Sequence, residues 1–167
     1  EVAAAVGALP LMDGQITLLG EPIDKKIERN ARRGITLVPD SRGVFHKLSV
    51  AENLKLAQHR GGPDLDVVYG HFPRLKELRG RKCGNLSGGE QQMLALGGAL
   101  MTRPELLMID ELSLGLAPTI VGQLLEVVQE IHRRGLALVD LFSLGANLLG
   151  AKVGKHLLEH QLVFCQS

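Results

Sequence analysis

The feature that most constrains the fold is a set of three short apolar runs, each about the length of one buried β-strand. They are Ile35-Thr36-Leu37-Val38, Leu106-Leu107-Met108-Ile109 and residues 136–139. Runs of this kind are typical of strands buried on both faces of a parallel sheet. Helical patterns separate them along the chain, and strands that alternate with helices favour a parallel α/β sheet. The sequence therefore predicts an α/β fold.

Two helix starts are marked by capping boxes, in which a serine and a glutamate three residues later satisfy free N–H groups. The first, Ser49-Val50-Ala51-Glu52, predicts a helix that ends near residue 58, and the second, Ser87-Gly88-Gly89-Glu90, precedes a helix over residues 91–101. Pro118 suits the first turn of a further helix, which Gly135 would end. Its apolar face would contain Ile120, Leu124, Val127 or Val128, and Ile131. Residues 25–33 and 72–78 predict shorter helices, and residues 14–20 a strand between turns.

Composition excludes several classes of protein. The 167 residues are 45% hydrophobic, enough for a buried core in one domain. Lys and Arg number 19 against 18 Asp and Glu, so the chain has no basic field of the kind that attracts nucleic acid. Cys83 and Cys165 lack metal-ligand spacing, and no apolar run approaches the ~20 residues that span a bilayer.

Two motifs carry candidate chemistry, and each also has a structural interpretation. Ser87 and Glu90 could simply cap a helix, but a glycine-rich first turn also leaves N–H groups free to meet a phosphate. Asp110-Glu111, which follows the apolar run 106–109, could be only a polar strand end. Carboxylate oxygens are, however, the ligands that a hard cation such as Mg²⁺ prefers. In isolation, the polar strand end is the better interpretation of Asp110-Glu111, and the functional interpretation depends on a resemblance to a known family.

Taken together, two segments resemble the signature and Walker B motifs of the ABC-transporter ATPases. They are Leu86-Ser87-Gly88-Gly89-Glu90-Gln91-Gln92 and residues 106–111. The resemblance implies ATP and Mg²⁺ as cofactors. The residues it implies for contact with ATP are Leu86, Ser87, Gly88, Gly89, Glu90 and Gln91. Asp110 would hold Mg²⁺, and Glu111 would be the catalytic residue that orients the water attacking the γ-phosphate.

Two further segments resemble the subgroup of this family that energises branched-chain amino acid uptake. Residues 113–118 are similar to its D-loop segment, with Leu116 where many ABC ATPases have aspartate. Residues 38–45 lie where the family has its Q-loop, which senses the γ-phosphate and faces the membrane subunit. Asp40 stands where the subgroup has glutamate, and the resemblance assigns it to nucleotide binding. A simple turn explains this segment almost as well.

One expected motif is missing, because no stretch reads Gly-x-x-x-x-Gly-Lys-Ser/Thr, the loop that wraps nucleotide phosphates. Residues 6–14 are similar to the segment that follows this loop in the family. We therefore expect an ABC ATPase fold of the P-loop NTPase type that is incomplete at its N-terminus. Residues 1–167 alone are expected to hydrolyse ATP negligibly, which leaves open whether the chain acts as an enzyme.

The resemblance also implies an organisation and a function. Residues 1–40 and 101–167 would belong to the ATPase core, and residues 41–100 to a helical subdomain with the signature. The chain would be the ATP-binding subunit of an importer for branched-chain amino acids. It would pair with a second ABC ATPase subunit, alike or different, and attach through permease subunits to the inner face of the cell membrane. A degenerate binding protein without turnover and an ABC ATPase outside transport are the alternatives.

Overall fold

The computed structural model describes residues 17–18, 21–22, 27–39, 41–59, 61–109 and 115–140. Its main sheet contains β3 (Ile35–Val38), β4 (Leu106–Ile109) and β5 (Ala137–Asp140), all parallel and in that order. The prediction of a parallel α/β sheet is confirmed, and β3 and β4 have the predicted bounds. β5 starts and ends one residue later than predicted. A separate antiparallel ribbon joins β1 (Thr17–Leu18) to β2 (Glu21–Pro22).

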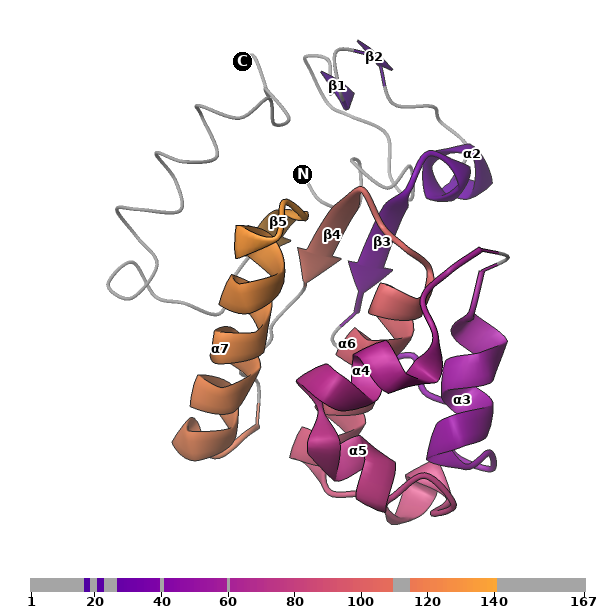
Figure 1. The fold of residues 1–167 in the computed structure, drawn as a ribbon, viewed down its shortest axis with the longest axis vertical. Coiled ribbons are helices and arrows are strands. Elements are labelled where there is room, and N and C mark those ends of the chain that lie inside the picture. The colour runs from indigo at the N-terminus through magenta and orange to yellow at the C-terminus, as the bar shows by residue number, and fades with distance from the viewer. Residues whose placement is uncertain are drawn as a thin grey trace.

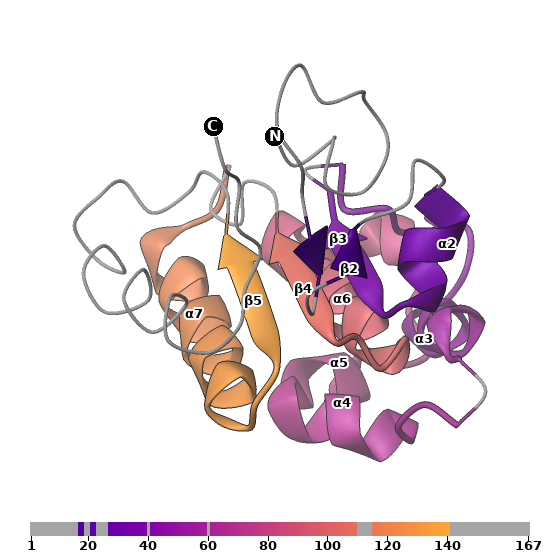
Figure 2. The same ribbon diagram turned by 90° about the horizontal axis from the view of Figure 1, so that it is seen from above.

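Helices gather at one end of this sheet and along its side. The cluster comprises α3 (Val50–Ala57), α4 (Leu65–His71), α5 (Pro73–Glu77) and α6 (Gly88–Met101). It lies on the side toward which β3 and β4 point, whereas α7 (Pro118–Arg133) runs beside β5 (Figures 1 and 2). The remaining helices are α2 (Ile27–Arg32), which contacts β3, and the 3₁₀ turn η1 (Cys83–Asn85). The proposed division of the chain at residues 40 and 100 stays a prediction.

The capping boxes explain where two of these helices begin. The Ser49 hydroxyl accepts from the Glu52 N–H at 3.3 Å, and the Glu52 carboxylate accepts from the Ser49 N–H at 2.7 Å. α3 therefore begins where the sequence predicts. α6 begins at Gly88, three residues before the predicted start, so both glycines lie inside the helix. α4 was not predicted from the sequence, which indicated a helix only over residues 72–78.

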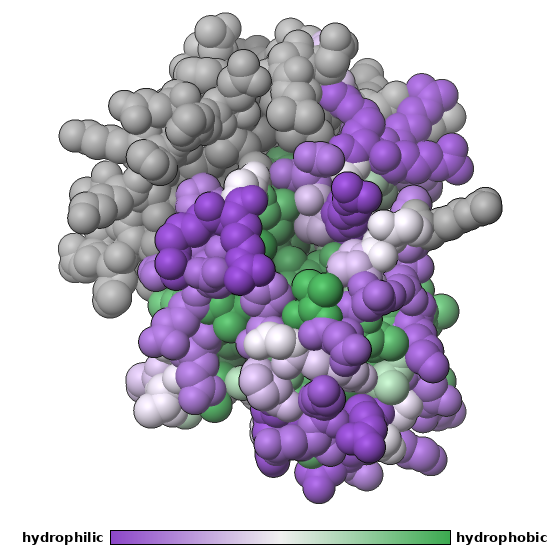
Figure 3. Space-filling view, in the orientation of Figure 1, coloured by the Kyte–Doolittle hydropathy of each residue, from purple (hydrophilic) through white to green (hydrophobic). Residues whose placement is uncertain are grey.

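One hydrophobic core joins the helical cluster to the sheet. α6 is its centre, since it contacts α3, α4, α5, α7 and β3. Fully buried residues from each part meet there: Val38, Leu54, Val68, Leu75, Leu94, Leu107 and Leu124. On the face drawn in Figure 3, apolar residues show between α7 and the helical cluster, and polar residues cover much of the outer surface. None of the helices in the described ranges is long and apolar enough to cross a membrane.

Two adjacent glycines of α6 provide a matched test of this packing. A Cβ built on Gly97 would lie 2.8 Å from Val68 Cγ1 and 3.3 Å from Leu54 Cδ2, both in fully buried side chains. A Cβ on Gly98 would meet only Ala57 Cβ, at 3.7 Å. We expect Gly97→Ala to lower the free energy of unfolding by about 1–2 kcal/mol, because overpacking exceeds the gain in helix propensity. Gly98→Ala should raise it by about 0.5–1 kcal/mol.

Urea unfolding of both variants, followed by circular dichroism, measures these changes. Equal effects of the two substitutions would contradict the close packing of α6 against α3 and α4.

Candidate functional site

The carboxyl ends of the three parallel strands lie level with one another. Val38 pairs with Ile109, and Ile109 pairs with Asp140. Asp110 and Glu111 follow Ile109 directly in sequence, and Asp40 lies two residues after Val38. All three predicted site residues lie outside the described residues. In the described ranges, no group of three His, Cys, Asp or Glu side chains comes together to hold a metal ion.

The predicted signature segment forms the capped start of α6. The Ser87 hydroxyl accepts from the Glu90 N–H at 3.2 Å, and the Glu90 carboxylate accepts from the Ser87 N–H at 2.9 Å. The Gln91 N–H donates to the Ser87 carbonyl at 2.9 Å. Among the described residues, no acceptor contacts the N–H groups of Gly88 and Gly89. The positive end of the α6 dipole thus carries two unused donors, as an anion-binding helix start requires.

The two glycines differ in what surrounds them. A Cβ on Gly89 would lie 2.7 Å from Ile120 Cγ2, so Gly89 is needed for the packing of α6 against α7. A Cβ on Gly88 would meet Arg42 Nη2 and Leu116 Cδ2 at 3.5 Å, which is ordinary van der Waals contact. Packing in the described part of the chain therefore explains the glycine at position 89 but not the one at position 88. The latter position is free to serve a ligand that approaches the backbone closely.

The flanking predicted residues hold the loop before α6. Leu86 is buried in the core. Gln91 donates from Nε2 to the Cys83 carbonyl at 3.2 Å and to the Leu86 carbonyl at 3.4 Å. These side chains therefore shape the loop that leads into Ser87.

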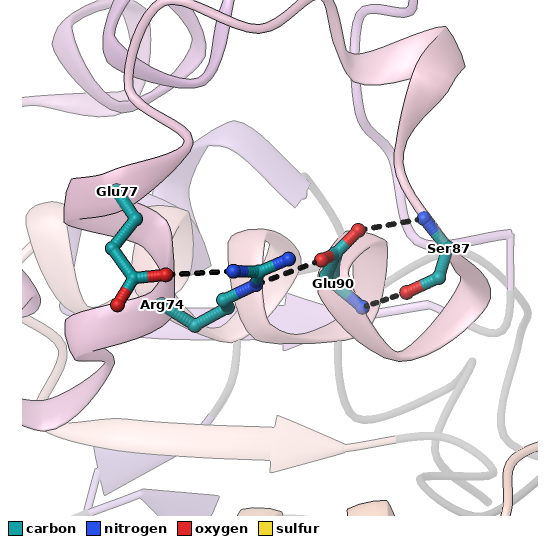
Figure 4. Close-up of polar contacts among 4 residues, drawn as sticks. All are labelled: Arg74, Glu77, Ser87 and Glu90. Atoms are coloured by element: carbon teal, nitrogen blue, oxygen red, sulfur yellow. Dashed lines mark hydrogen bonds and ion pairs between the residues drawn. The ribbon is translucent and has the colours of Figure 1, made fainter.

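An arginine from another helix supports the capping glutamate. Arg74 in α5 donates from Nε to Glu90 at 3.0 Å and from Nη1 to Glu77 at 2.6 Å (Figure 4). Burial opposes ionisation of Glu90, but its hydrogen bonds with the Ser87 N–H and Arg74 outweigh burial and lower the pKa of its carboxyl. Glu90 therefore stays ionised at neutral pH, where it both caps α6 and complements the helix dipole.

The lowered pKa of Glu90 gives stability a predictable pH dependence. Because the folded state binds this proton less tightly than the unfolded state, the stabilisation is present above the unfolded pKa and is lost as pH falls. We expect the urea concentration at the unfolding midpoint to decrease as the pH is lowered from about 5 to about 3. The fall should be shallower in Glu90→Gln, since glutamine can complete the capping box without a charge. Identical pH profiles for the two proteins would contradict this role of Glu90.

A second arginine contacts the other side of the α6 start. Arg42 donates from Nε to Gln92 Oε1 at 3.2 Å and from Nη1 to Gln91 Oε1 at 3.3 Å. No motif of the sequence assigns a role to Arg42 or Arg74. The sequence Pro39-Asp40-Ser41-Arg42-Gly43 is typical of a turn. It does not indicate that Arg42 contacts Gln91 and Gln92, which lie 49 and 50 positions further along the chain.

A cavity of about 510 Å³ lies next to this turn, between β3, α3 and α6. The turn lines it with residues 42–45, and Leu56 lines it from α3. Phe45 and Leu56 are 58% and 60% exposed, although both side chains are large and apolar. Both side chains thus present apolar atoms to solvent at the cavity.

Comparisons with known proteins show the family of the chain. The ABC transporter family matches residues 3–113. A high-affinity branched-chain amino acid transport ATP-binding protein, BraG of Pseudomonas aeruginosa, is 46% identical over 110 residues, 63% of this chain and 47% of that protein. A probable branched-chain amino acid transport ATP-binding protein, LivF of Archaeoglobus fulgidus, is 36% identical over 118 residues, 67% of this chain and 50% of its own length. The chain spans about half the length of these relatives.

Solved structures show the same fold. An ATP-binding cassette of an ABC transporter in its ADP conformation superposes with a TM-score of 0.71 at 20% identity, over 85% of this chain and 64% of that one. A nucleotide-free cassette superposes with a TM-score of 0.71 at 19% identity, over 96% of this chain and 68% of its own. The predicted fold class, the ABC ATPase type of P-loop NTPase, is therefore confirmed.

Proposed function

Because this chain belongs to the ABC transporter family, we propose that it supplies the signature and Walker B parts of an ATP-hydrolysing subunit in an importer for branched-chain amino acids. Family membership implies nucleotide binding. The amino acid class is proposed from the two relatives that are branched-chain transport ATP-binding proteins. The signature segment contacts a nucleotide held mainly by a second ABC ATPase subunit.

The observation that carries this proposal is the pair of unused N–H groups at Gly88 and Gly89, at the capped positive end of α6. They fit a phosphate group, since backbone donors and the helix dipole both favour an anion there. Ser87 adds a hydroxyl at the same end. In a head-to-tail pair of subunits, Ser87, Gly88 and Gly89 contact the γ-phosphate held across the interface.

We assign the remaining chemistry to the predicted carboxylates. Asp110 holds Mg²⁺, and Glu111 positions and polarises the attacking water. Asp40 senses the γ-phosphate from the turn after β3. The Mg²⁺ ion supplies neutralisation of the charge that develops during phosphoryl transfer.

The cavity beside the turn is the proposed contact with the permease. Phe45 and Leu56 offer exposed apolar surface there, and Phe45 lies a few residues along the sequence from Asp40. Docking at this cavity places the chain on the inner face of the cell membrane through the permease subunits. A transport role thus predicts a membrane partner that an ABC ATPase acting in translation or DNA maintenance does not need.

Co-purification with the permease, followed by uptake of labelled leucine into proteoliposomes, tests the proposal. The wild-type chain should co-purify with the permease and support ATP-driven uptake. Phe45→Ser and Leu56→Ser should lose both, whereas Val67→Ser should keep both. Val67 is 48% exposed on α4 and does not line the cavity, so it is a matched control. Stable folding without any permease association would favour the alternatives outside transport.

A further inference from the structure

Arg42 occupies a backbone position that is costly for arginine. Its φ is +62°, in the left-handed region, and Gly43 beside it has a φ of +58°. The Arg42 N–H donates to the Pro39 carbonyl at 2.9 Å, which closes the turn after β3. A non-glycine residue in such a conformation is strained, so the surrounding structure must hold it there.

The Arg42 side chain joins this turn to the first two turns of α6. Its planar fork reaches the side-chain oxygens of Gln91 and Gln92 at 3.3 and 3.2 Å. Its third nitrogen, Nη2, lies 3.5 Å from the place where a Cβ on Gly88 would be. Arg42 thus contacts Gln91 and Gln92 and lies beside Gly88. The single point charge of a lysine could not span both glutamine oxygens in the same way.

The charge of Arg42 is not neutralised by these contacts. Both acceptors are neutral amides, and no carboxylate in the described ranges forms an ion pair with Arg42. A cation beside the positive end of a helix is unfavourable. Gln92 is only 3% exposed, and its Nε2 has no hydrogen-bond partner among the described residues. Its Oε1 is therefore the amide atom that the Arg42 contact uses. The network therefore fixes a position rather than neutralising a charge.

We propose that Arg42 is a positioning residue for the signature: it fixes the N–H groups of Gly88 and Gly89 relative to the turn after β3. Arg42 also lines the cavity formed by β3, α3 and α6. A molecule that docks in this cavity and moves the turn therefore moves the start of α6 with it. The functional meaning of this link rests on the proposed function, because it couples permease docking to nucleotide contact.

The test compares three variants of Arg42 in the full chain by ¹H–¹⁵N spectra recorded without nucleotide. Arg42→Gly relieves the left-handed backbone, so it should unfold at or above the wild-type midpoint and still shift the amide signals of Gly88 and Gly89. Arg42→Gln and Arg42→Lys should shift the same signals, since neither can bridge both glutamines. Arg103→Gln is the matched control, because Arg103 is exposed and also has a positive φ, of +54°.

Unchanged Gly88 and Gly89 signals in Arg42→Gly would overturn the proposal, and so would wild-type signals in Arg42→Lys. These spectra contain no nucleotide, so their outcome does not depend on the proposed function. In a second measurement, MgATP-dependent pairing with a subunit that carries a phosphate loop should weaken about threefold to tenfold in Arg42→Gln. Shifted signals without any MgATP-dependent pairing by the wild type would refute the proposed function but leave the positioning role standing.

Discussion

In a protein that joins a phosphate loop to these residues, Glu111→Gln is expected to lower ATP hydrolysis by the assembled importer at least about 100-fold, the range in which loss of a positioned general base falls. Glutamine keeps the size of the side chain but cannot polarise water as a carboxylate does. The measurement is phosphate release by that protein together with its partner subunit and permease, at saturating MgATP. Glu126→Gln is the control, because Glu126 is exposed on α7 and carries the same charge.

Glu126→Gln should leave the rate unchanged. Retention of more than half of the wild-type rate by Glu111→Gln would show that the segment after β4 is not the catalytic Walker B motif. Without its partner subunit, the chain should release negligible phosphate, because its sequence contains no phosphate loop.

Leu54→Ala is expected to have the largest effect on stability, a loss of about 2–5 kcal/mol in the free energy of unfolding. Leu54 is fully buried where α3 packs on α6, and its removal leaves a cavity against Gly97. Leu56→Ala, two residues along the same helix, should change stability by less than about 0.5 kcal/mol because Leu56 is 60% exposed. Chemical unfolding of the two variants under identical conditions measures both effects.

Equal losses for Leu54→Ala and Leu56→Ala would contradict the orientation of α3 against α6. The comparison also separates stability from docking, since Leu56 lines the cavity and is assigned to the permease contact.

Local patterns in the sequence predict most of the elements. The sequence predicts the bounds of β3 and β4 to the residue, because each is a short, largely apolar run. It predicts the start of α3 because Ser49 and Glu52 form a capping box. α4 was missed because its short, mixed sequence has no local signal. It is anchored by Val68, which packs over Gly97 of α6, and contacts of this kind depend on the folded chain.

The same limit applies to the candidate site. The capping box from Ser87 to Glu90 is encoded within four residues, so sequence alone predicts it, although α6 begins three residues before the predicted start. Arg74 lies 16 residues from Glu90, and Arg42 lies 49 residues from Gln91. No local sequence pattern predicts the contact of Arg74 with Glu90 or of Arg42 with Gln91, because each contact depends on how two elements pack. The roles of Asp40, Asp110 and Glu111 stay predictions from the resemblance.

The most direct test of the central claim, that the start of α6 contacts a nucleotide phosphate, is to measure how Gly88→Asp changes pairing with a phosphate-loop subunit. A Cβ at Gly88 would meet only ordinary van der Waals contacts, and a carboxylate is favourable at the positive end of α6, so the variant should fold about as stably as wild type. Its carboxylate should repel the phosphate and abolish MgATP-dependent pairing in sedimentation. Gly122→Asp, an equal charge change in open space near the start of α7, should pair as wild type does. Undiminished MgATP-dependent pairing by Gly88→Asp would contradict the claim.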